Sequence, residues 1–158
     1  MLDKLTVIDL FCGAGGLSTG FKEEGFNILL GVDANSKAID TFIANHSDSQ
    51  VICEDMTKIT LNEISSKINT LDVDVVVGGP PCQGFSMAGK RKPNDPRNSL
   101  FKEYLRIVSK IRPKIFVMEN VRGLLSMKNE AGERVIDIIL KEFRKLEGYT
   151  VNYYSVNV

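Results

Sequence analysis

The sequence predicts an α/β protein whose sheet is mainly parallel and flanked by helices. Apolar runs rich in β-branched residues alternate along the chain with segments whose apolar residues recur at helical spacing, which is typical of βαβ units. The expected strands are residues 5–11, 27–32, 50–53, 73–78, 115–118 and 149–156. A chain of 158 residues, 43% of them hydrophobic, is sized for a single globular domain, residues 1–158.

Two segments carry the clearest helical patterns. Residues 98–111 place apolar side chains at spacings of three and four, and Pro113 follows as a stop signal. Residues 131–146 repeat the pattern, with basic residues in the last turns and Gly148 as the expected cap. We interpret both apolar faces as parts of the core.

Composition and charge limit the classes of function. Lys plus Arg equals Asp plus Glu at 20 each, so any contact with nucleic acid must be local. Three widely spaced cysteines and one histidine, His46, predict neither a disulfide framework nor a metal site. We interpret His46 as a surface residue that ends a helix. No apolar run has the roughly 18 residues of a membrane span, and a signal-peptide pattern is missing, so we expect a cytoplasmic protein with reduced thiols.

A glycine-rich stretch follows the first expected strand and leads into a helix. It reads Gly13-x-Gly15-x-x-Ser18, which is less than the full dinucleotide fingerprint, and Asp33 ends the second strand 20 residues after Gly13. Glycines let backbone amides approach a ligand, and an acid at that position suits ribose hydroxyls. The pattern therefore predicts a nucleoside cofactor, and both nicotinamide and S-adenosylmethionine remain open at this point.

The fourth and fifth strands deliver reactive residues to one edge. Pro80, Pro81 and Cys82 follow residues 73–78, and Glu119 and Asn120 follow residues 115–118. Ligands bind beyond the carboxyl ends of such strands, and two prolines stiffen the turn that aims the thiol. A thiolate is a nucleophile, and a carboxylate partly desolvated in a crevice can donate a proton near neutrality. We expect a nucleophile and an acid to act together here.

Three blocks carry a resemblance that covers nearly the whole chain. Residues 9–16 (DLFCGAGG), 80–83 (PPCQ) and 119–120 (EN) occur in the order found in the cytosine carbon-5 DNA methyltransferases. The resemblance implies a Rossmann-like, S-adenosylmethionine-dependent methyltransferase fold. It also implies a DNA (cytosine-5-)-methyltransferase that acts on double-stranded DNA, with a role in a restriction-modification system.

The resemblance also assigns roles to residues. Phe11 would stack on adenine, Asp33 would hold the ribose and Asp55 would accept from the adenine amino group. The full implied cofactor set is Phe11, Gly13, Gly15, Leu17, Asp33, Asp55, Met56, Pro80 and Leu100. For catalysis, the Cys82 thiolate would attack carbon 6 of a cytosine flipped out of the duplex, and Glu119 would hold ring nitrogen 3. Asn120 would position Pro80 and the cysteine loop by hydrogen bonding.

Residues 86–97 carry four basic residues against one acid. The segment is rich in turn-forming residues and begins beside Cys82, so we expect a loop that closes over a flipped base near phosphates. The residues assigned to nucleic-acid contact are Ser86, Lys90, Arg91, Lys92 and Arg97.

One departure from the family concerns what the sequence lacks. Full-length relatives continue with a Gln-x-Arg-x-Arg block, a target-recognition domain and a late segment that completes the cofactor pocket. We expect residues 1–158 to be an incomplete, apparently truncated catalytic domain, either a fragment or one subunit of a split enzyme. Sequence-specific methylation by this chain alone is therefore not expected.

Three alternative functions stay open. The first is an RNA cytosine methyltransferase of the same family, and the second is a non-catalytic module that binds S-adenosylmethionine or a partner. The third, a nicotinamide-dependent oxidoreductase built on the glycine loop, leaves Cys82 and Glu119 without a purpose.

Overall fold

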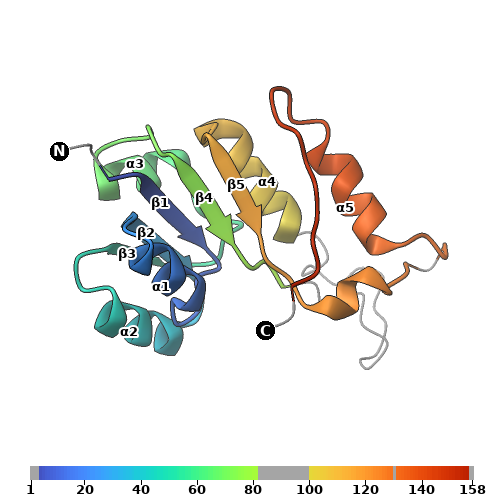
Figure 1. The fold of residues 1–158 in the computed structure, drawn as a ribbon. Helices are drawn as coiled ribbons and strands as arrows, with labels where there is room; N and C mark the ends of the chain where they lie inside the picture. Colours follow the sequence, from blue (N-terminus) through green and yellow to red (C-terminus); the bar gives the residue numbers. More distant parts are fainter. Residues whose placement is uncertain (1–3, 82–99, 130, 157–158) are drawn as a thin grey trace.

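The computed structural model describes residues 4–81, 100–129 and 131–156. Its centre is a parallel sheet of order β3-β2-β1-β4-β5 (Figure 1). The strands are β1 (Thr6–Leu10), β2 (Asn27–Asp33), β3 (Gln50–Cys53), β4 (Val75–Gly78) and β5 (Ile115–Met118). The predicted α/β class, with a parallel sheet and flanking helices, is therefore confirmed. The strand order reverses between β1 and β4, which is where ligands bind in such sheets.

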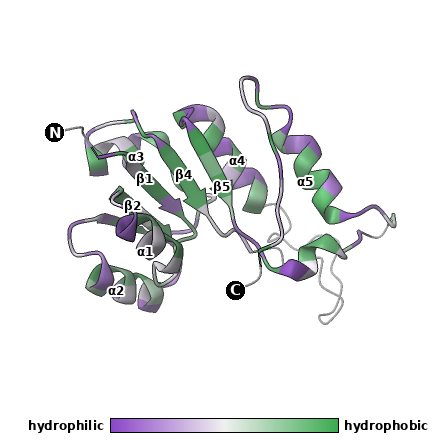
Figure 2. Cartoon of the chain, in the orientation of Figure 1, coloured by the Kyte–Doolittle hydropathy of each residue, from purple (hydrophilic) through white to green (hydrophobic). Residues whose placement is uncertain are grey.

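Helices cover the sheet unevenly on its two faces. They are α1 (Gly16–Glu23), α2 (Ser36–Asn45), α3 (Leu61–Ile68), α4 (Leu100–Ile111) and α5 (Val135–Phe143), with a 3-10 turn η3 (Arg122–Leu125). The larger core cluster joins β1, β2 and β4 to α3, α4 and α5, and the smaller joins the opposite sides of these strands to α1 and α2. Figure 2 shows strands that are hydrophobic along most of their length and helices in which hydrophobic and hydrophilic residues alternate. This is expected when helices cover both faces of a sheet, because the strands are then buried on both sides.

The strand register brings the carboxyl ends of the strands to one edge. Leu10 pairs with Val32 on one side and with Gly78 on the other, and Gly78 pairs with Met118. Because all the strands are parallel, the loops after them share this edge. The glycine loop, Asp33, Asp55, Pro80 and Glu119 therefore belong to one side of the molecule.

The segment at residues 149–156 corrects one prediction. We expected a sixth strand there, but residues 149–156 form no ladder with the described strands. Tyr149 holds the segment through its side chain instead, because its hydroxyl donates to the carbonyl of Pro113 and its ring lies under the guanidinium of Arg112 at 5.3 Å. A side-chain anchor has replaced the expected backbone pairing.

The helix expected at residues 131–146 is shorter than predicted. Before it, Gly132 has a φ of +80° inside a turn closed by the N–H of Glu133 donating to Oδ1 of Asn129, so α5 begins at Val135. After it, Leu146 donates to Phe143 over three residues, which closes the last turn as a 3-10 turn. In contrast, α4 ends at Ile111 before Pro113, as predicted.

Tyr104 connects α4 to the two strands beneath it. Its side chain is fully buried, and its hydroxyl lies 2.9 Å from the carbonyl of Val76 in β4 and 3.0 Å from that of Val117 in β5. One hydroxyl proton is thus shared between the carbonyls of neighbouring strands. These bonds help to fix β5, the edge strand that delivers Glu119.

Replacing Tyr104 by Phe is expected to lower the free energy of unfolding by about 1–2 kcal/mol, because it removes the hydrogen bonds of a buried hydroxyl to the carbonyls of Val76 and Val117. Urea denaturation of both proteins measures this difference. Tyr154→Phe is the matched control, since Tyr154 is 85% exposed and its change should leave the midpoint unmoved. An unmoved midpoint for Tyr104→Phe would contradict the bridging role.

Candidate active site

The glycine loop after β1 forms a tight turn that backbone hydrogen bonds hold in place. The N–H of Cys12 donates to Val32 at 3.0 Å, and the N–H of Gly15 donates back to Cys12 at 2.9 Å. Gly15 has a φ of +90°, and a Cβ there would lie 2.5 Å from the His46 ring, so only glycine fits. Phe11 has a φ of +61°, a strain of roughly 1 kcal/mol for a residue with a side chain. Its half-buried ring packs on the larger core.

Asp33 is fixed by two backbone donors. Its Oδ2 accepts from the N–H of Gly13 at 2.9 Å, and its Oδ1 accepts from the N–H of Asn35 at 2.8 Å. Each carboxylate oxygen has capacity for a second donor. Asp33 thus ties the end of β2 to the glycine loop and can still accept hydroxyl donors from a ligand.

Asp55 lies in the loop between β3 and α3 and uses one oxygen for the local turn. Its Oδ1 accepts from the N–H of Thr57 at 2.8 Å and from the Thr57 hydroxyl at 2.7 Å. These two hydrogen bonds hold the pKa of Asp55 below its ordinary value, and the bond from the backbone N–H makes the larger contribution. Among the described residues Oδ2 has no partner, so this exposed carboxylate oxygen is available to a donor such as an exocyclic amine.

His46 corrects the sequence prediction most directly, because it is buried and not a surface residue. It is 1% exposed, its Nε2 lies 3.1 Å from the carbonyl of Gly15, and its ring packs on Phe42 at 4.5 Å. Its neighbour Asn45 donates from Nδ2 to the carbonyl of Ala14 at 3.5 Å. The end of α2 therefore supports two consecutive carbonyls of the glycine loop.

The remaining cofactor candidates differ in how much surface they offer. Met56 is 3% exposed and belongs to the larger core. Little of its side chain is therefore accessible for the predicted contact with a ligand. Leu17 is half-buried in α1 and packs against the smaller core. Leu100 is half-buried at the first residue of α4. We retain Leu17 and Leu100 as predicted contacts.

The ends of β4 and β5 meet as the sequence predicts. Asn120 donates from Nδ2 to the carbonyl of Pro80 at 2.9 Å, and the N–H of Glu119 donates to Gly78 at 2.9 Å. A Cβ on Gly79 would lie 3.1 Å from Oε2 of Glu119, so this carboxylate stands beside the segment that leads to Cys82. Glu119 is exposed among the described residues, and the predicted partial desolvation of its carboxylate stays a prediction.

The predicted nucleophile and the basic loop lie outside the described residues. These are Cys82, Ser86, Lys90, Arg91, Lys92 and Arg97. Their roles stay predictions from the sequence. In the part of the chain with described geometry, no three His, Cys, Asp or Glu side chains gather as a metal site, and no helix is both long and apolar enough to cross a membrane.

The two described cysteines are free thiols in opposite environments. Cys12 is buried, and desolvation, followed by the nearby charges of Asp9 and Asp33, raises the pKa of its thiol far above the ordinary value. Cys53 is exposed at the end of β3. Since thiolates are the reactive form, we expect the buried Cys12 to react slowly in the folded protein.

Alkylation of the native protein with iodoacetamide is therefore expected to label Cys53 at least about 100-fold faster than Cys12. Peptide mapping by mass spectrometry at successive times measures both rates. In urea the two thiols should react alike, which controls for local sequence. Equal rates in the native protein would contradict the burial of Cys12.

Arg106 is a residue of this site that sequence reasoning missed. It lies on the polar side of α4, and its partners are the carbonyls of Met56 and Ile59, 50 and 47 residues earlier. In the sequence, the one local feature of Arg106 is that it follows Glu103 by three residues, which predicts an ion pair of a kind common on exposed helix surfaces. No pattern of neighbouring residues could have shown that it reaches the Asp55 loop.

Sheet order and site together define a class of protein. A parallel sheet whose strand order reverses between β1 and β4, with a glycine loop after β1 and acids at the next strand ends, is a Rossmann-like α/β domain. In such domains ligands bind beyond the carboxyl ends of the strands. The chain belongs to the C-5 cytosine-specific DNA methylase family, whose model matches residues 5–158. The resemblance seen in the sequence is thereby confirmed.

Known proteins are similar to this chain over nearly its whole length. The Type II methyltransferase M.DdeI of Desulfomicrobium norvegicum is 48% identical over 153 residues, covering 97% of this chain and 36% of that protein. M1.HphI of Haemophilus parahaemolyticus, another Type II methyltransferase, is 47% identical over 156 residues, covering 97% of this chain and 41% of that protein.

A solved structure agrees with the fold. The crystal structure of a putative DNA modification methyltransferase encoded within a prophage of E. coli superposes with a TM-score of 0.74 at 33% identity. The match covers 90% of this chain and 38% of that one. This chain thus spans less than half the length of each of these three relatives.

Proposed function

We propose that this chain binds S-adenosylmethionine at the carboxyl edge of its sheet and contributes the catalytic half of a DNA cytosine-5 methyltransferase. The observation that carries the proposal is the hydrogen bond between Asp33 and the Gly13 amide, which joins the glycine loop to the acid that closes β2. The same edge receives the Pro80 segment and Glu119 from the two strands beyond the reversal of strand order. One edge therefore collects groups for a nucleoside cofactor and for catalysis.

The residues present fit such a cofactor. Asp33 has acceptor capacity for ribose hydroxyls, Oδ2 of Asp55 for an adenine amino group, and the half-buried Phe11 ring has surface for stacking. A Cβ on Gly13 would meet no atom within 4 Å, so the space above that glycine is open. Carboxylates on this edge also suit a cationic ligand. Bound there, S-adenosylmethionine would supply an electrophilic methyl group.

The catalytic groups would act on a cytosine flipped out of the duplex. The Cys82 thiolate would add to carbon 6, and the protonated Glu119 carboxyl would donate its proton to ring nitrogen 3, which stabilises the negative charge that the addition pushes into the ring. Carbon 5 would then carry the electron density needed to take the methyl group, while the electron pair of the broken carbon–sulfur bond would stay on the sulfur as a neutral thioether. A base removes the proton from carbon 5, and the thiolate leaves carbon 6. Asn120, through its bond to the carbonyl of Pro80, positions the loop that bears the cysteine.

Partners of the whole protein form a further part of the proposal. The family description supports DNA as substrate, and the relatives' names, as Type II methyltransferases, support a role in a restriction-modification system. We propose that this DNA is double-stranded. Ser86, Lys90, Arg91, Lys92 and Arg97 would contact the phosphates. Ile115 and Val117 of β5 are 57% and 38% exposed on the sheet face that α1 and α2 leave open. A covering segment or a second chain over these apolar side chains, which would carry target recognition, remains part of the proposal.

The experiment that tests the proposal follows a labelled methyl group from S-adenosylmethionine to unmethylated DNA, with Cys82→Ala as the control variant. Label in 5-methylcytosine that disappears in Cys82→Ala supports the chemistry and shows that this chain completes its own site. Cofactor binding without transfer, measured by titration calorimetry, is expected if the recognition part is required in addition. Preference for NADH over S-adenosylmethionine would overturn the proposal, and so would transfer that survives Cys82→Ala.

A further inference from the structure

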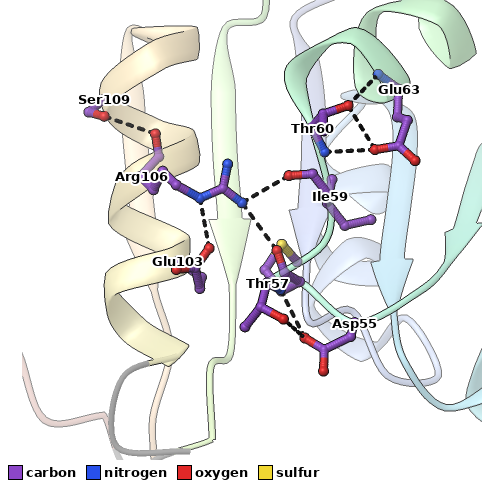
Figure 3. Close-up of polar contacts among 9 residues, drawn as sticks. Asp55, Thr57, Ile59, Thr60, Glu63, Glu103, Arg106 and Ser109 are labelled. Carbon is purple, nitrogen blue, oxygen red and sulfur yellow. Dashed lines mark hydrogen bonds and ion pairs between the residues drawn. The ribbon is translucent and has the colours of Figure 1, made fainter. Parts of the chain in front are cut away.

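Arg106 on α4 reaches across to the loop that carries Asp55 (Figure 3). Its Nη2 donates to the carbonyl of Met56 at 3.1 Å and to that of Ile59 at 2.9 Å. Its Nε donates to Oε2 of Glu103, one turn earlier on the same helix, at 2.7 Å. The guanidinium is therefore oriented by Glu103 of its own helix, and its other hydrogen bonds go to backbone carbonyls of a different segment.

The two carbonyls that Arg106 binds lie on either side of Thr57, the residue that donates to Asp55. Met56 and Ile59 are 3% and 2% exposed, so solvent water does not replace the guanidinium easily. Between them, Thr57 donates twice to Oδ1 of Asp55, and the N–H of Lys58 donates to the carbonyl of Asp55 at 2.9 Å. Movement of the bracketing carbonyls would carry the Thr57 donors with it.

The far end of the loop is anchored separately. Thr60 and Glu63 form a capping box at the start of α3, with the Thr60 hydroxyl accepting from the N–H of Glu63 at 3.2 Å. Figure 3 shows this box and the Arg106 contacts on opposite sides of Ile59. The helix cap fixes where the loop ends, and Arg106 fixes the part between the cap and Asp55.

We propose that Arg106 is a positioning residue that holds the Asp55 carboxylate in the orientation needed to accept from the adenine amino group of the cofactor. This inference rests on the proposed function. Arg106 itself would touch neither cofactor nor substrate and would act through the Met56–Ile59 backbone. The pairing also joins α4, which follows the cysteine loop in the chain, to the predicted adenine end of the site.

The first test reads the Asp55 turn without any cofactor. The pKa of Asp55, followed by carboxyl-carbon NMR, is below its ordinary value because Thr57 donates to it, and Arg106→Met is expected to raise it toward that value. Arg106→Lys keeps the positive charge and can retain one carbonyl contact, so a smaller rise is expected. Lys58 and Glu54, the other charged groups beside Asp55, are unchanged in both variants. An Asp55 pKa unmoved in Arg106→Met, or in Arg106→Lys should Arg106→Met fail to fold, would overturn the proposal.

A matched control separates the carbonyl contacts from loss of a helix ion pair. Arg134 pairs with Asp137 at the same spacing of three, at 2.7 Å on the exposed side of α5, and the structure shows no contact from it to the Asp55 loop. Arg134→Met is expected to leave the pKa of Asp55 unchanged. A rise as large as that in Arg106→Met would mean that the effect is a general loss of charge.

The second test uses a double-mutant cycle for S-adenosylmethionine affinity. Arg106→Met is expected to weaken binding about tenfold, which is about 1.4 kcal/mol. If Arg106 acts through Asp55, then adding Arg106→Met to Asp55→Asn costs little more than Asp55→Asn alone. Full additivity would overturn the positioning role. Failure of the unmodified chain to bind S-adenosylmethionine would count against the proposed function, while the NMR test would still decide what Arg106 does to Asp55.

Discussion

Gly78→Ala is expected to prevent stable folding, with a loss of about 4 kcal/mol or more in the free energy of unfolding. A Cβ on Gly78 would lie 2.2 Å from the carbonyl oxygen of Leu10 and 3.0 Å from the ring of Tyr104. The first neighbour is backbone of the adjacent strand, so no side-chain rotation relieves the overlap. The strands β1 and β4 would have to separate where their ends form the proposed site.

Urea denaturation followed by circular dichroism measures this loss. Gly20→Ala is the matched control, because Gly20 lies in α1 and an added Cβ would meet nothing within 4 Å. That change is expected to stabilise the protein by about 0.5–1 kcal/mol, since alanine favours helix. A Gly78→Ala protein as stable as the original would mean that β1 and β4 are not packed as closely as the structure has them.

Asp9→Asn is expected to change how stability depends on pH. Asp9 is 1% exposed in β1, and desolvation raises the pKa of its carboxyl to about 6, although Ser18 donates to it at 2.6 Å. The folded state therefore holds a proton between the unfolded pKa of 3.8 and about 6 that the unfolded state has released. Linkage then requires the contribution of Asp9 to the free energy of unfolding to fall as pH rises through that range.

The measurement is the difference in unfolding free energy between Asp9→Asn and the unmodified chain at pH 4 and pH 7. We expect this difference to favour Asp9→Asn by about 2–3 kcal/mol more at pH 7 than at pH 4, while contributions of the other acids cancel. Ser18→Ala is the companion variant, since removing a donor to the carboxylate should raise the Asp9 pKa further. A difference independent of pH would show that Asp9 titrates as an ordinary surface acid.

Local patterns were sufficient for most of the fold. Strands β1 to β5 and helix α4 were predicted within a few residues, because apolar runs and helical spacing record burial at each position and Pro113 ends a helix by removing a donor. The glycine loop and Asp33 could be paired from spacing alone, since successive parallel strands end at one edge. The family followed from the order of short motifs around Phe11, Pro80 and Glu119.

Partners distant in the chain escaped prediction. His46 looks polar and terminal in the sequence, yet it is buried because the Gly15 turn and Phe42 close over it. Residues 149–156 have strand composition, but the anchor of Tyr149 on Pro113 competes with a ladder.

By itself the sequence determined which segments are strands, where the reactive residues follow them and which family they belong to, because those properties depend on near neighbours. Only the tertiary structure decided that Arg106 holds the Asp55 loop, that His46 supports the glycine loop and that Asp9 is desolvated. Burial and hydrogen bonding at these positions depend on atoms that folding brings together from elsewhere in the chain.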